Sequence, residues 1–76
     1  MKHFKGKIQF NTAHLVGVNS YGTVHDYMYT LHHTYGVEFD EYRQQYKTSG
    51  GSYFTVEQMR GYYDKGYIKI INKSFK

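Results

Sequence analysis

The supply of core side chains constrains this chain most, because aromatic rings must stand in for aliphatic residues. Two leucines and four isoleucines are present among 76 residues, against ten tyrosines and five phenylalanines. A domain of this size buries only about 60% of the surface of its unfolded chain. Cysteine is absent, so neither disulfides nor thiolate metal ligands stabilise the fold. We therefore expect one small domain over residues 1–76, with a core that reaches the surface.

The fifteen tyrosine and phenylalanine rings exceed what one small core can hide. Tyrosine gives a large contact area at a low cost in conformational entropy, and its hydroxyl needs a partner or water. Surplus rings are therefore expected at an interface, either in a homodimer or with a larger partner. Tyr53, after a glycine- and serine-rich stretch, and the neighbours Tyr62 and Tyr63 are the predicted contact rings.

Positive charge is concentrated at the two ends of the chain. The net charge is +4 and the pI is about 9.3. All six carboxylates lie between Asp26 and Asp64, so both ends are purely basic. A basic protein favours nucleic acid or an acidic protein surface as its partner.

Both ends of the chain also show the period-two alternation of half-buried strands. Phe4, Ile8 and Phe10 alternate with polar residues, and Ile68 and Ile70 do the same. The two terminal strands are expected to pair, because a lone edge strand would be poorly held. Alternation then gathers a basic strip on the face away from the core: His3, Lys5, Lys7, Lys69 and Lys73.

Three helices are predicted between these strands. The first covers residues 23–35, where Thr23 is a good N-cap, apolar residues recur at helical spacing and Gly36 follows. The second is short and starts after Asp40. The third starts after Thr55, where Gln58 completes a capping box.

The predicted fold is therefore an α+β domain with the element order β(β)αααβ. A small antiparallel sheet contains the N- and C-terminal strands, with residues 14–18 as a candidate third strand. This sheet is expected to pack on the three short helices.

The stretch HDYMYTLHHTYG, residues 25–36, contains three histidines and invites a test for metal binding. Ligands from one helix must lie one turn apart, whereas residues seven apart, such as His25 and His32, are separated by about 10.5 Å along the axis. On a helix, His33 would point away from both His25 and His32. No phosphate-loop or nucleophile motif is present either. We predict a non-enzymatic protein without metal or cofactor; a small His-dependent enzyme or metal site is the least favoured alternative.

A direct DNA- or RNA-binding protein is the main alternative. Residues 24–47 fit part of a helix-turn-helix pattern with Gly36 in the turn, although His32 stands where a small residue is wanted. The residues that would read bases are Arg43, Gln44, Gln45 and Lys47. The basic strand face offers a second mode, in which lysines track the backbone of a single strand.

No residue run resembles a signal peptide, and the longest apolar run falls far short of the ~20 residues of a membrane span. A cytoplasmic protein without a membrane partner is expected. In its size, its tyrosine, lysine and asparagine content and its lack of a catalytic motif, the chain resembles small accessory proteins of phages and mobile elements, such as CRISPR inhibitors. The resemblance implies a regulatory protein, cytoplasmic in the phage host, that occupies a macromolecular partner such as a nucleic-acid-handling host complex. The predicted partner-binding residues are Lys5, Lys7, Tyr53, Tyr62, Tyr63, Lys69 and Lys73.

Overall fold

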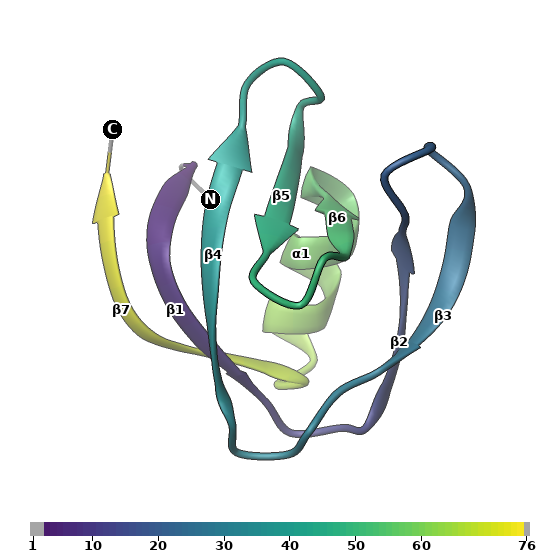
Figure 1. Ribbon diagram of the computed structural model, residues 1–76. Coiled ribbons are helices and arrows are strands. Elements are labelled where there is room, and N and C mark those ends of the chain that lie inside the picture. The colour runs from purple at the N-terminus through teal and green to yellow at the C-terminus, as the bar shows by residue number, and fades with distance from the viewer. Residues whose placement is uncertain (1–2, 76) are drawn as a thin grey trace.

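The computed structural model describes residues 3–75, and within them one curved antiparallel sheet wraps around a single helix (Figure 1). The sheet has the strand order β3-β2-β6-β5-β4-β1-β7, with β3 and β7 at its edges. The elements are β1 (Phe4–Phe10), β2 (His14–Val18), β3 (Val24–Met28), β4 (Thr34–Asp40), β5 (Gln45–Thr48), β6 (Tyr53–Thr55), α1 (Val56–Asp64) and β7 (Ile68–Phe75).

The core lies between the concave face of the sheet and α1, which Figure 1 shows behind β5 and β6. Alternate residues of each central strand supply it, and most of its volume is aromatic. Its fully buried side chains include Phe4, Ile8, Phe10, Tyr46, Phe54, Met59 and Ile68. The face away from α1 is the convex face, and it carries the polar residues of the same strands.

The predicted α+β fold with three helices is wrong, because the chain is mainly sheet and one short helix is present in the described residues. Three parts of the prediction are confirmed. The terminal strands β1 and β7 pair antiparallel, and residues 14–18 form β2. The helix α1 begins after Thr55, whose hydroxyl accepts from the Gln58 N–H while the Gln58 side chain accepts from the Thr55 N–H.

The predicted first helix is instead the edge strand β3, a turn and the start of β4. The residues that would have formed its buried face are largely exposed: Val24 by 65%, Met28 by 74% and Leu31 by 46%. His32 has a φ of 62°, which a helix cannot contain. Valine and tyrosine are strand-favouring residues, and pairing with β2 outweighs the helical spacing of the apolar residues.

The predicted second helix is the tip of the β4–β5 hairpin. Asp40 Oδ1 accepts from the N–H groups of Tyr42 and Arg43, and Gln44, with a φ of 57°, leads into β5. An aspartate accepts from the same positions at a helix N-cap and in a turn. The prediction that Asp40 caps a helix is therefore wrong, because its carboxylate caps a hairpin turn instead.

Candidate macromolecule-binding surface

Strand register defines a lysine-rich part of the convex face. Directly opposite residues of antiparallel strands project from the same face. Lys5 of β1 lies opposite Glu38 of β4, and Glu38 lies opposite Lys47 of β5. In the adjacent rows, Lys7 lies opposite Gly36 and Asn72, and Gln9 lies opposite Thr34 and Lys69. We call the side chains of Lys5, Lys7, Glu38, Lys47 and Lys69 the cationic face.

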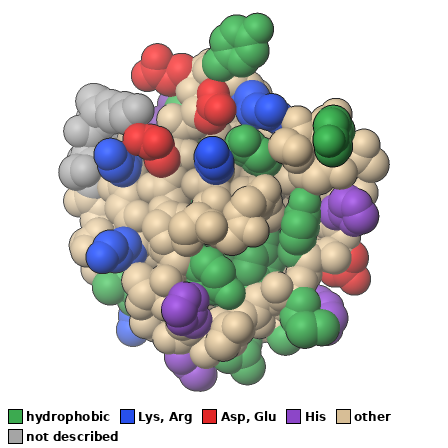
Figure 2. Space-filling view, viewed as in Figure 1, with side chains coloured by type: hydrophobic (Ala, Val, Ile, Leu, Met, Phe, Trp, Pro, Cys, Tyr) green, Lys and Arg blue, Asp and Glu red, His purple; other side chains and the backbone are tan. Residues whose placement is uncertain are grey.

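Positive charge exceeds negative charge on this part of the convex face. Lys5 and Lys47 lie on either side of Glu38, Lys7 and Lys69 lie in further rows, and Asp40 follows Glu38 on the same side of β4. Lys5 Nζ lies 3.4 Å from a Glu38 carboxylate oxygen, with both side chains more than half exposed. Such a surface pair stabilises the fold by only about 0–1 kcal/mol. In Figure 2, positive and negative side chains are mixed over the region of β1, β4 and β5, while most histidine side chains lie in the lower and right-hand parts of the view.

Two adjoining hollows flank the ridge formed by Lys5 and Lys7. The first, of about 410 Å³, is lined by these lysines together with Gly36, Lys47 and Ser49, among others. The Gly36 N–H donates to Ser49 Oγ at 3.1 Å and the Ser49 N–H donates to the Gly36 carbonyl at 2.9 Å, which fixes the floor of the hollow. The second hollow, also of about 410 Å³, is lined by Lys5, Gly6, Lys7, Asn72 and Lys73.

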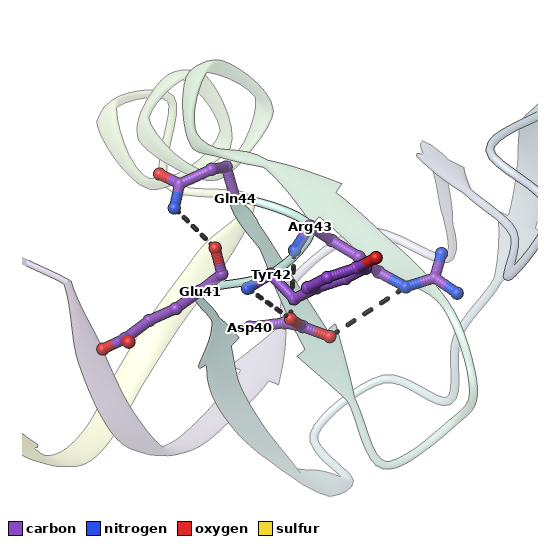
Figure 3. A network of polar contacts seen from close by, with 5 residues as sticks. All are labelled: Asp40, Glu41, Tyr42, Arg43 and Gln44. Carbon is purple, nitrogen blue, oxygen red and sulfur yellow. Dashed lines mark hydrogen bonds and ion pairs between the residues drawn. The ribbon is translucent and has the colours of Figure 1, made fainter.

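The tip of the β4–β5 hairpin follows the Glu38–Lys47 row of the cationic face, and Figure 3 shows its residues Asp40, Glu41, Tyr42, Arg43 and Gln44. Tyr42 is 98% exposed there, although Asp40 holds its backbone in a defined turn. Gln44 Nε2 donates to the Glu41 carbonyl at 2.6 Å and closes the turn. The tip therefore presents a tyrosine ring on an ordered backbone.

The predicted contact tyrosines are less available than the sequence suggested. Tyr53 is 7% exposed and lies beneath the Arg43 guanidinium, 4.6 Å from its ring centroid. Tyr62 packs against Phe54, and its hydroxyl donates to the Val16 carbonyl at 2.6 Å. Tyr63 is 45% exposed on α1.

The basic strip forms only in part. Lys5, Lys7 and Lys69 share a face, as predicted from alternation. Lys73 lies opposite Gly6, in the row that alternates with theirs, because β7 contains an extra residue, Ile71, at a bulge. The ring of His3 stacks on Phe39 at 3.6 Å and so covers the core.

The most exposed tyrosines, Tyr21 and Tyr42, were not predicted as contact residues. Tyr21 is 91% exposed in the β2–β3 loop, where Asn19 Oδ1 accepts from the N–H groups of Tyr21 and Thr23. Each tyrosine follows an asparagine or aspartate by two residues. That spacing places a ring at the tip of a side-chain-capped turn and is a signal that the sequence contained.

The proposed helix-turn-helix over residues 24–47 is wrong, because this segment is β3, β4, β5 and their connections. Of the residues proposed to read bases, Arg43 covers Tyr53, and Gln44 bonds within the turn. Gln45 lies between Asp40 and Thr55 on neighbouring strands. Lys47 belongs to the cationic face.

The histidines of residues 25–36 do not converge. His25 lies on β3, and His32 and His33 lie in the turn that precedes β4. Within residues 3–75, no three histidine or carboxylate side chains are grouped as metal ligands would be. The helical spacing that was used to argue against a shared ion does not apply to this segment, which is not helical.

The buried polar groups form a structural network. The Tyr29 hydroxyl bonds to Ser52 Oγ, and Ser52 Oγ bonds to Thr48 Oγ1 at 2.8 Å. Burial raises the pKa of Tyr29 to about 12, so the hydroxyl stays neutral near pH 7. This network ties the loop before β6 to the segment after β3.

The chain matches no protein-family model, no curated protein and no solved structure. No helix in the described part of the chain is long and apolar enough to cross a membrane.

Proposed function

We propose that this chain is a non-enzymatic regulatory binding protein whose cationic face occupies an anionic surface of a macromolecular partner. The observation that carries the proposal is the register that places Lys5, Lys7, Lys47 and Lys69 on one face, where the carboxylates of β4 are Glu38 and Asp40, and Asp40 pairs with Arg43. These lysines stand on strands held by pairing on both sides or by the core, so their backbones are ordered before binding. Preorganised groups lose less entropy on association.

The chemistry of this face favours recognition of charge over recognition of bases. Its rows on β1, β4, β5 and β7 contain lysine, glutamate, glutamine, asparagine, threonine and glycine. The aromatic ring next to them, Tyr53 of β6 opposite Lys47, is 7% exposed and lies beneath Arg43, so it offers little surface for stacking. Stacking on aromatic side chains is the usual means of holding unpaired bases. We therefore infer contact with phosphates or with acidic side chains, and the positive charge argues against mimicry of DNA.

A nucleic-acid-handling complex of the host is the partner that this chemistry fits best, since such complexes present both phosphates and acidic side chains. Tyr42 at the hairpin tip would add an apolar contact beside the charged rows, because tyrosine gives a large area at a low entropy cost. Direct binding of nucleic acid through the same lysines is the second candidate. The unbroken strand that carries Lys5 and Lys7 favours it, because phosphate contacts need only correctly spaced charge.

The test is capture of partners from a host lysate by the tagged chain, with and without nuclease. The double variant Lys7→Gln/Lys47→Gln removes two charges from the cationic face. Arg60→Gln/Lys65→Gln removes two charges from around α1 and is the matched control for net charge.

We expect the first variant to lose most of the captured partner and the control to retain it. Equal losses in both variants would show that only net charge matters and would contradict the assignment of the surface. Loss of capture after nuclease treatment, with a salt-sensitive gel shift by the purified chain, would establish the second candidate instead.

A further inference from the structure

The two edges of the sheet differ in how well they are protected. An edge strand exposes unpaired backbone groups, which proteins commonly blunt with lysines or bulges. The β7 edge has both, in Lys69, Lys73 and the bulge at Ile71. The β3 edge has neither: its pairing with β2 continues without a register shift from Val24 to Met28.

Hydrogen bonds at the two ends of β3 show which of its backbone groups point outward. The Asn19 N–H donates to the Thr23 carbonyl at 2.9 Å, and the Tyr29 N–H donates to the Ala13 carbonyl at 2.6 Å. In an antiparallel pair, hydrogen-bonded and non-bonded positions alternate. Residues 25 and 27 therefore bond to β2, while the N–H and C=O groups of Val24, Asp26 and Met28 face the open edge.

The side chains of these same three residues share the convex face. Asp26 lies opposite Val16 and Val24 lies opposite Val18 on β2. Val24 is 65% exposed and Met28 is 74% exposed, and Asp26 between them is also exposed. The edge therefore presents one carboxylate with an apolar side chain two residues to either side.

We propose that β3 takes up an extended segment of a partner protein as an eighth strand of the sheet. Main-chain hydrogen bonds supply affinity in this mode, and alternate side chains supply specificity. The segment that fits carries lysine or arginine opposite Asp26 and apolar residues two positions to either side, opposite Val24 and Met28.

Charge distinguishes this occupant from a second copy of the chain. A two-fold antiparallel pairing of β3 with itself that matches Val24 to Met28 places Asp26 directly opposite Asp26 of the other copy. Like charges in directly opposite positions are destabilising. The inference does not depend on the proposed function, because the β3 edge and the cationic face are separate surfaces.

The experiment uses two end-capped peptides, Thr-Val-Thr-Lys-Thr-Val-Thr and the same sequence with glutamate in place of lysine. Each is titrated to millimolar concentration into the full chain and into the Asp26→Lys variant, with amide hydrogen exchange followed by NMR. Because Asp26 is exposed on an edge strand, the variant is expected to fold.

We expect the lysine peptide to slow exchange at the amides of Val24, Asp26 and Met28, with no added protection at residues 25 and 27. The wild-type chain should prefer the lysine peptide about threefold, and Asp26→Lys should prefer the glutamate peptide by a similar factor. Absence of the alternating protection, or the same peptide preference in both proteins, would overturn the proposal. Alternating protection that grows with protein concentration alone would assign the edge to a second copy and overturn it equally.

Discussion

Removing the hydroxyl of Tyr29 is expected to destabilise the fold, whereas removing that of Tyr46 is expected to leave its stability unchanged or to raise it. Both rings are buried, at 5% and 0% exposure. The Tyr29 hydroxyl bonds to Ser52 Oγ inside the core. The Tyr46 hydroxyl has no hydrogen-bonding partner among the described residues, although the Phe4 backbone lies close enough to moderate the rise in its pKa that burial causes.

The hydrogen bonds of each hydroxyl determine the expected change in the free energy of unfolding. Tyr29→Phe leaves Ser52, at 1% exposure, with one hydroxyl partner fewer, and an unsatisfied buried group costs about 1–3 kcal/mol. Because Thr48 Oγ1 still bonds to Ser52 Oγ, we expect a loss near the lower end, about 1–2 kcal/mol. Tyr46→Phe removes a hydroxyl that was desolvated without full compensation. We expect no loss, or a gain of up to about 1 kcal/mol.

Urea unfolding of the wild type and the two variants, followed by circular dichroism, measures both changes. The two substitutions remove the same atom from the same kind of residue, so each is the control for the other. A loss of 1 kcal/mol or more in Tyr46→Phe would show that its hydroxyl is satisfied in solution. Unchanged stability in Tyr29→Phe would refute the role given to the Tyr29–Ser52–Thr48 network.

Two further predictions concern pH and the glycines of the sheet. Burial raises the pKa of Tyr29 to about 12 from 10.0. The contribution of Tyr29 to stability is therefore complete below pH 10 and is lost as the pH rises towards 12. The Tyr29→Phe variant should lack this loss of stability between pH 10 and 12 in alkaline unfolding. Gly6→Ala should destabilise the fold by about 1–3 kcal/mol, since a Cβ there would overlap the main-chain carbonyl of Asn72. Gly36→Ala should change stability by no more than about 0.5 kcal/mol, because its Cβ would meet only the Ser49 Cβ, at 3.8 Å. Thermal unfolding of both alanine variants compares the two sites, and equal losses would contradict the assignment of Gly36 to an open hollow.

The elements that sequence reasoning identified correctly are those whose signals are complete within a few residues. The capping box of Thr55 and Gln58 specifies a helix start by two reciprocal bonds. The alternation of Phe4, Ile8 and Phe10 leaves only a strand as the structure that buries all three. Neither signal depends on a distant part of the chain.

The prediction for residues 24–35 was wrong because the apolar spacing of this segment fits a helix, while the strand that it pairs with lies outside the segment. Val24 and Met28 are four residues apart, which places them on one face of a helix and equally on one face of a strand. Pairing with β2 decides between the two, and periodicity cannot reveal it. Asp40 shows the same ambiguity at a turn.

The candidate surface was predictable where alternation was regular. Lys5, Lys7 and Lys69 follow from period two alone, whereas Lys73 is displaced by the bulge at Ile71, which nothing in the local sequence marks. Lys47 joins them only because β5 pairs with β4, and this pairing was hidden by the helical interpretation of the preceding residues.

The distribution of tyrosines explains why the proposed binding surface is more polar than the composition suggests. Six of the ten rings lie in or against the core or are buried elsewhere: Tyr27, Tyr29, Tyr35, Tyr46, Tyr53 and Tyr62. Several of these satisfy their hydroxyls internally, as Tyr62 does on the Val16 carbonyl. The curved sheet therefore absorbs most of the rings, and the exposed ones are spread over separate turns and α1. If the chain binds as we propose, a partner would meet isolated rings beside rows of lysine, and charge pattern and the β3 backbone, more than apolar area, would determine what is bound.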